Sequence, residues 1–317
     1  MKGKYIMNLF GKGSRATTSR INVSVVLTCI LSFCCAVSLT AFNRSYLGEN
    51  GLYKNSSPVW LLVLLAIMSM GASVFGALNM SSRSDASLLP KYNGKATVVI
   101  SVVMIAEFVS IFALYFLLGP LDLRYGVGHG VANMPDIVEK MKIALLCYRL
   151  LIPLSLFASV YFVIAAMKKR IDPLFGCITL IWLLLYILRL YFDISDWVMS
   201  VRKLTVICAV CVFAMFLMNE IRFAFGRASF RKYFFFASLS AVFCISSGFA
   251  GVCSIFIKIY PLNYELGYYG VLLFMGLYAL VRVLSFLPEK RSHREIYDAY
   301  APSEEREDAE SDKKYEL

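Results

Sequence analysis

Histidine, charge and catalytic signatures are all scarce in this sequence. Only 17% of its 317 residues are charged, and its two histidines, His129 and His293, both lie outside the long apolar runs. The sequence also lacks the zinc-site motif H-E-x-x-H, the nucleophile motif G-x-S-x-G and the phosphate-binding motif G-x-x-x-x-G-K-[ST]. An intramembrane hydrolase or a metal-dependent transferase needs such clustered groups, so we expect no catalytic residue, no metal site and no cofactor.

Long polar segments and disulfide-forming cysteines are missing as well. The longest connection between apolar runs, residues 119–142, is too short to hold a folded catalytic domain. Its glycine-rich segment GVGHG lacks the preceding strand and following helix that a phosphate-binding loop requires, so we interpret it as an outer loop. All nine cysteines lie within apolar runs, where a free cysteine packs as a small apolar side chain.

The sequence is instead 59% hydrophobic, and its apolar residues are gathered into eight runs. A hydrocarbon core of about 30 Å is crossed by roughly 20 apolar residues in a helix, and the runs have comparable lengths. We therefore predict an all-α, polytopic membrane protein, a bundle of about eight transmembrane helices. The predicted spans are residues 22–42, 58–78, 96–118, 143–166, 174–191, 204–221, 234–256 and 268–287.

Three segments follow from this pattern. Residues 1–21 contain five basic residues and no acidic one, and we interpret them as a basic cytoplasmic lead. The run after them is longer than the apolar core of a secretory signal, about 7–15 residues, so it is expected to stay as the first span. Residues 22–288 form the transmembrane domain. Residues 289–317, with ten acidic and six basic residues, are predicted to be a disordered, charged cytoplasmic tail.

Lysine and arginine are distributed unevenly between the two sides of the predicted bundle. With the N-terminus inside, the inner segments hold 21 of these residues and the outer segments hold eight. Because positive charge favours the cytoplasmic side, both termini are predicted to be cytoplasmic. The basic residues behind the formal net charge of +11 lie at the ends of the spans, so the expected partner is a bilayer with anionic lipids. A protein bound by the tail is an open alternative. No nucleic-acid partner is expected.

Two charged residues lie well inside predicted spans. Glu107 is near the middle of the third span, and Arg149 is in the outer third of the fourth, four residues before Pro153. Ionisable residues are costly at this depth, and consecutive spans are antiparallel neighbours, so we expect Glu107 and Arg149 to pair. Two interpretations stay open: a proton-coupled or ion-coupled site at the Pro153 kink, or an ion pair that fixes the register of two helices.

Two further charged sets lie nearer to the ends of spans. On the inner side, Glu220 ends the sixth span and Arg282 lies about one turn inside the end of the eighth, so their similar depth predicts a contact. On the outer side, Arg189 and Asp193 are four residues apart and share a helix face, and Asp196 follows in the turn. These three are candidate outer-mouth residues, although two aspartates supply too few oxygens for a calcium site.

The connection between the sixth and seventh spans is basic. We predict that its four cationic side chains contact anionic lipid headgroups on the inner side of the membrane. They are Arg222, Arg227, Arg231 and Lys232.

The seventh span is rich in small residues four apart, among them Ser240, Cys244 and Gly248. Small side chains let helix backbones approach closely in lipid, so we predict a central packing helix. A substrate path lined by the serines of this span is the open alternative.

The segment 183–233 contains two short patterns, LLLYILRLYFDIS and FLMNEIRFAFGRASFRKY. Together they resemble a pattern in uncharacterised multi-span membrane proteins of Clostridia-type Firmicutes. The residues that carry the resemblance are Tyr191, Phe192, Asp193, Glu220, Arg222, Phe223, Gly226, Arg227 and Arg231. The resemblance implies a bacterial inner membrane and implies no activity, because no function is assigned to that family.

Three classes of function remain, and they are given in the order in which the sequence favours them. The first is a non-enzymatic membrane protein that senses or scaffolds, acting on partners through its tail and its basic inner loops. The second is a transporter or permease subunit with Glu107 and Arg149 near the path, and the third is an intramembrane enzyme. The surroundings of Glu107 discriminate between the first two, because a wet cavity shared with Arg149 favours transport and dry packing favours a scaffold.

Overall fold

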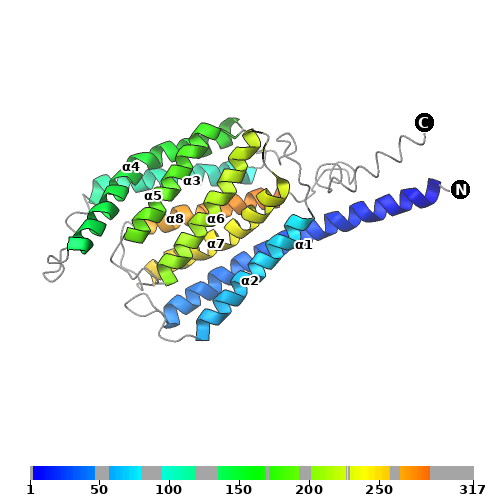
Figure 1. Ribbon diagram of the computed structural model, residues 1–317, viewed down its shortest axis with the longest axis horizontal. Helices are drawn as coiled ribbons and strands as arrows, with labels where there is room; N and C mark the ends of the chain where they lie inside the picture. Colours follow the sequence, from blue (N-terminus) through cyan, green and yellow to red (C-terminus); the bar gives the residue numbers. More distant parts are fainter. Residues whose placement is uncertain are drawn as a thin grey trace.

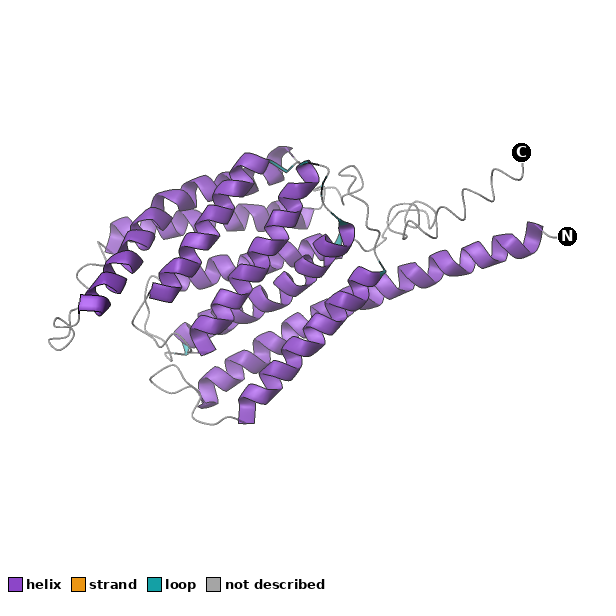
Figure 2. Cartoon of the chain, viewed as in Figure 1, coloured by secondary structure: helices purple, strands orange, loops and turns teal. Residues whose placement is uncertain are grey.

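In the computed structural model, every regular element of the described chain is a helix (Figure 2). The described residues are 3–46, 57–79, 95–118, 135–168, 171–192, 201–225, 227, 229–257 and 265–285. The helices are α1 (Gly3–Tyr46), α2 (Ser57–Leu78), α3 (Lys95–Leu118), α4 (Pro135–Lys168), α5 (Pro173–Phe192), α6 (Val201–Ala224), α7 (Phe230–Phe256) and α8 (Glu265–Leu284). The predicted all-α class is confirmed.

Seven of these helices are long and apolar enough to cross a membrane, and α3 adds a shorter apolar stretch, Val98–Ala113. Helices satisfy all their backbone hydrogen bonds internally, which is why they can span lipid, and the chain is a multi-span helical membrane protein. Two helix starts differ from the predicted spans by more than about one turn. The first helix already begins at Gly3 and projects beyond the bundle (Figure 1), and α4 begins at Pro135, within the predicted outer loop.

Proline and aspartate mark where α4 and α5 begin. Pro135 and Pro173 are the first residues of these helices, a position at which the missing N–H of proline costs nothing because it has no intrahelical partner. Before α5, the Asp172 Oδ1 atom accepts the backbone N–H groups of Leu174 and Phe175 at 3.1 and 3.3 Å. Asp172 therefore caps the N-terminus of α5, and the local sequence is sufficient to determine where this helix begins.

Six of the helices close into a ring. Each helix from α3 to α7 contacts the next one along the chain, and α8 closes the ring by packing on α3. The first two helices lie outside this ring, packed on each other and on α7 (Figure 1). Since α7 thereby contacts α1, α2, α6 and α8, the central position predicted for it is confirmed.

Aromatic side chains fill the interior of the ring. The ring centroid of Phe108 in α3 is 5.0 Å from that of Trp182 in α5 and 5.9 Å from that of Phe162 in α4. Phe162 in turn meets Tyr278 of α8 edge-on at 5.3 Å. All four side chains are buried. Edge-on and offset aromatic pairs stabilise a core beyond the area that they bury, so over these residues the ring encloses packed side chains.

Small residues bring α7 and α8 into backbone contact. A Cβ atom added at Gly248 would lie 2.6 Å from the Cα of Leu273 in α8, and one added at Gly276 would lie 2.6 Å from the backbone nitrogen of Ile245 in α7. Toward α6, the Ser247 hydroxyl donates to the carbonyl of Thr205 at 3.2 Å. Close packing and interhelical hydrogen bonds are what hold helices together in lipid, so the packing role predicted for the seventh span is confirmed.

Replacing Gly248 by alanine should therefore destabilise the protein, because the new methyl group meets backbone that can move only if the two helices separate. We expect a loss of about 1–3 kcal/mol, the usual cost of overpacking. Thermal unfolding in detergent, followed by tryptophan fluorescence, measures it. Gly71→Ala is the matched control, since a Cβ there would meet nothing within 4 Å. Equal unfolding midpoints for the two variants would contradict this account of the α7–α8 contact.

Candidate functional site

A fully buried ion pair lies near the predicted cytoplasmic end of the ring. Glu220, close to the end of α6, is 0% exposed, and Arg282, in the last turn of α8, is 1% exposed. The Arg282 Nε atom is 3.1 Å from Oε1 of Glu220. The contact that the similar depth of these residues predicts is present.

Three tyrosine hydroxyls surround the same carboxylate. Tyr161 of α4 donates to Oε2 of Glu220 at 2.8 Å, Tyr233 of α7 donates to Oε1 at 3.1 Å, and Tyr278 of α8 donates to Oε2 at 3.3 Å. Arg282 Nε also donates to the Tyr233 hydroxyl oxygen at 2.9 Å, which links two of the donors. We refer to these five residues as the Glu220 cluster.

The contacts within the Glu220 cluster offset the desolvation free energy of a carboxylate in an apolar interior. A buried charge needs a counter-charge and enough hydrogen bonds to replace its water shell, and here a guanidinium and three hydroxyls supply them. Because the donors come from α4, α7 and α8 while the acceptor is on α6, the hydrogen bonds can form only if all four helices meet at one register. The arrangement holds helices in place and leaves the carboxylate no solvent-exposed face with which to react.

The tyrosines of this cluster were not predicted from the sequence. A tyrosine deep within an apolar run is a signal in itself, because its hydroxyl needs a hydrogen-bond partner when it is buried. Tyr161 and Tyr278 both lie in predicted spans, so this rule could have marked them. It could not have shown that both hydroxyls reach Glu220, which is 59 and 58 residues away in the chain.

Arg189, a predicted outer-mouth residue, lies in a cage of aromatic rings. It is 3% exposed, and its guanidinium carbon is 4.7 Å from the ring centroid of Tyr268, 5.4 Å from that of Tyr148 and 6.0 Å from that of Tyr186. Cation–π attraction over these rings explains how a desolvated arginine is tolerated. The other two outer-mouth candidates, Asp193 and Asp196, lie outside the described residues, and their role stays a prediction.

Glu107 and Arg149 are directed to different surroundings. The carboxylate of Glu107 lies against Gly270 of α8, so close that a Cβ added there would be 2.6 Å from Oε2. Arg149 is exposed on α4. Between these two described residues there is no ion pair, so the expected pairing is corrected. The physical reason is the ring: α3 touches both α4 and α8, and Glu107 is on the side of α3 that faces α8.

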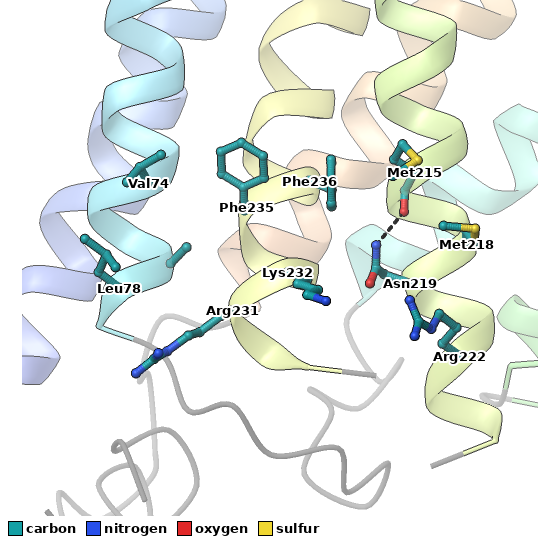
Figure 3. Close-up of a pocket in the computed structure, with 11 residues that line it drawn as sticks. Val74, Leu78, Met215, Met218, Asn219, Arg222, Arg231, Lys232, Phe235 and Phe236 are labelled. Carbon is teal, nitrogen blue, oxygen red and sulfur yellow. Dashed lines mark hydrogen bonds between the residues drawn. The ribbon is translucent and has the colours of Figure 1, made fainter. Parts of the chain in front are cut away.

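Three of the four predicted headgroup-contacting residues line one depression, which we call the inner groove. It lies between α2, α6 and α7, bounded by Leu78, Met218 and Phe236, and has a volume of about 480 Å³ (Figure 3). Arg222, Arg231 and Lys232 line it. The fourth predicted residue, Arg227, is exposed on the connection from α6 to α7 and is not part of its lining.

Comparisons with known protein families, with curated proteins and with solved structures find no match for this chain.

Removing the cation from the Glu220 cluster should be severely destabilising. Arg282→Met leaves the buried carboxylate without its counter-charge, and loss of one partner from a buried pair costs about 3–5 kcal/mol. The double variant Glu220→Gln/Arg282→Met removes both charges and should recover much of that loss. Thermal unfolding of the purified variants in one detergent measures both effects. Arg222→Met is the control, because Arg222 is an exposed arginine in the last turn of α6, two residues after Glu220; an equal loss there would contradict a special role for Arg282.

Proposed function

We propose that this chain is a non-enzymatic integral membrane protein that senses or scaffolds, acting through contacts with partner proteins. The observation that supports this proposal best is the Glu220 cluster, in which the buried carboxylate of α6 accepts hydrogen bonds from residues of α4, α7 and α8. A carboxylate held in this way has no free face for proton or substrate exchange. The activity then belongs to the surfaces of the bundle, and the resemblance noted above favours the cell membrane of a bacterium as its location.

The predicted cytoplasmic surface is the side that offers most to a partner. Arg222, Arg227 and Lys232 are exposed at the inner ends of α6 and α7, where they form a basic rim. Helix α8 ends on the same side at Leu284, and the sequence after it, residues 289–317, carries ten acidic residues. Segments of opposite charge on one face provide complementary surfaces, and charge of this kind contributes more to partner choice than to raw affinity.

The test is purification of the full-length protein from its native membrane in a mild detergent, with mass spectrometry of what accompanies it. We expect a partner in stoichiometric amount that is lost when residues 289–317 are deleted. A second variant, with the acidic residues of the tail changed to amides, separates the effect of charge from that of length. A protein that purifies alone, or a partner that survives the deletion, would contradict action through the tail.

Transport is the alternative, and one observation favours it. Glu107 lies mid-way along α3, partly exposed, at the contact with Gly270 of α8, and an acidic residue at this depth is a functional candidate by its cost alone.

In proteoliposomes with an imposed pH gradient, this alternative predicts proton flux that Glu107→Gln abolishes while the unfolding temperature stays unchanged. Glu139→Gln, at an exposed acid near the start of α4, is the matched control and should leave the flux intact. Flux no faster than in empty liposomes, or unchanged flux in Glu107→Gln, would end the coupled-transport alternative.

A further inference from the structure

The inner groove is cationic at its mouth and apolar further in. Arg222 lies in the last turn of α6, and Arg231 and Lys232 lie in the first turn of α7; Figure 3 shows Lys232 between the two arginines. Beyond them the walls include Met218 and Leu78, which are 36% and 64% exposed. Cations toward the predicted cytoplasmic surface and apolar side chains toward the bilayer follow the order of headgroup and acyl chain in a lipid leaflet.

The cationic mouth is suited to an anion such as phosphate. Arg222 and Lys232 are exposed, so their charged ends are accessible from the groove. The N-terminus of α7 adds a partial positive charge at the same place, since the first N–H groups of a helix have no intrahelical acceptor. The side chain of Ser229, which precedes α7, makes no capping hydrogen bond to them.

A second, independent feature of the groove points to a ligand. Asn219 lines the groove and is 2% exposed, and its Nδ2 atom donates to the Met215 carbonyl at 2.8 Å. That bond turns Oδ1 toward the cationic mouth (Figure 3), and among the described residues Oδ1 has no hydrogen-bond partner. A buried acceptor without a donor is costly, so the groove lacks one hydrogen-bond donor that a bound molecule would supply.

We propose that the inner groove binds one molecule of an anionic phospholipid whose headgroup carries a hydroxyl beside its phosphate, a class that phosphatidylglycerol represents. Arg222 and Lys232 hold the phosphate by charge-assisted hydrogen bonds. The Asn219 Oδ1 atom accepts the headgroup hydroxyl proton, and an acyl chain covers Met218 and Phe236. The groove volume of about 480 Å³ lies within the roughly 300–1,000 Å³ of ligand pockets.

A phospholipid fits this groove better than the acidic tail of the same chain does. The carboxylates of residues 289–317 match the cations, but that segment has few apolar side chains to cover Leu78 and Met218. Inorganic phosphate likewise matches the mouth and leaves the apolar walls bare. The lipid site does not depend on the partner proposed above, because its contacts all come from described residues of α2, α6 and α7.

The test is a titration of the delipidated full-length protein with phosphatidylglycerol, read by native mass spectrometry. Arg222→Gln and Lys232→Gln should each weaken binding about tenfold, since one charge-assisted hydrogen bond is worth about that much. Arg227→Gln is the matched control: it removes the same charge from the same connection but does not line the groove, and it should weaken binding by less than about twofold.

The outcomes separate the possible occupants. Equal weakening in all three variants would overturn the proposal, because it would show general attraction to a basic connection. Much tighter phospholipid binding after deletion of residues 289–317 would show that the tail occupies the groove. Displacement of the lipid by millimolar inorganic phosphate would assign the mouth to a soluble anion, and either of these results would also overturn the lipid site.

Asn219→Leu tests the headgroup assignment separately. We expect this variant to bind phosphatidylglycerol about fivefold more weakly, because it loses the contact to the headgroup glycerol hydroxyl, which phosphatidic acid lacks. Binding of phosphatidic acid itself should not change. Unchanged affinity for both lipids, with an unfolding temperature equal to that of the wild type, would contradict a hydroxyl contact at Asn219.

Discussion

The burial of one carboxylate constrains most of this structure. Glu220 is 0% exposed, and a charge so placed is tolerated only with a counter-charge and hydrogen bonds to replace its water. Its hydrogen-bond partners come from three other helices, α4, α7 and α8. No short sequence motif predicts these contacts. The depth of α6 relative to these neighbours is therefore set by polar geometry. Apolar packing fixes this depth less precisely, because in a bilayer an apolar side chain contacts lipid tails about as favourably as it contacts another helix.

The closed ring determines where function can be located. Its interior is occupied by aromatic rings from Phe108 to Tyr278 and by the Glu220 cluster, so the groups at the centre contact one another. The inner groove arises because α2 lies outside the ring, on α7, and leaves a depression between itself and α6. The ring and its two accessory helices thus separate a structural centre from a rim, and the proposed lipid site and partner contacts both lie on that rim.

Sequence patterns correctly predicted the features that depend on the depth of a residue in the membrane. They failed for contacts that depend on the order of the helices around the ring. Hydropathy placed the helices, and equal depth predicted the contact between Glu220 and Arg282, because both depend on position along the membrane normal. The pairing of Glu107 with Arg149 was wrong because chain order suggested α4 as the neighbour of Glu107, whereas ring closure turns it toward Gly270 of α8. The hydroxyl of Tyr161 reaching Glu220 is a long-range consequence of the same closure.

The central claim is that the Glu220 cluster is dry and fixed. Hydrogen–deuterium exchange of the full-length protein in lipid nanodiscs, followed by mass spectrometry of the peptides around Glu220 and Arg282, tests it most directly. The account predicts that these peptides of α6 and α8 remain protected for hours, as those of α7 do, because no water reaches the hydrogen bonds. Exchange within seconds at the inner ends of α6 and α8, with α7 still protected, would reveal water at the cluster and contradict the scaffold.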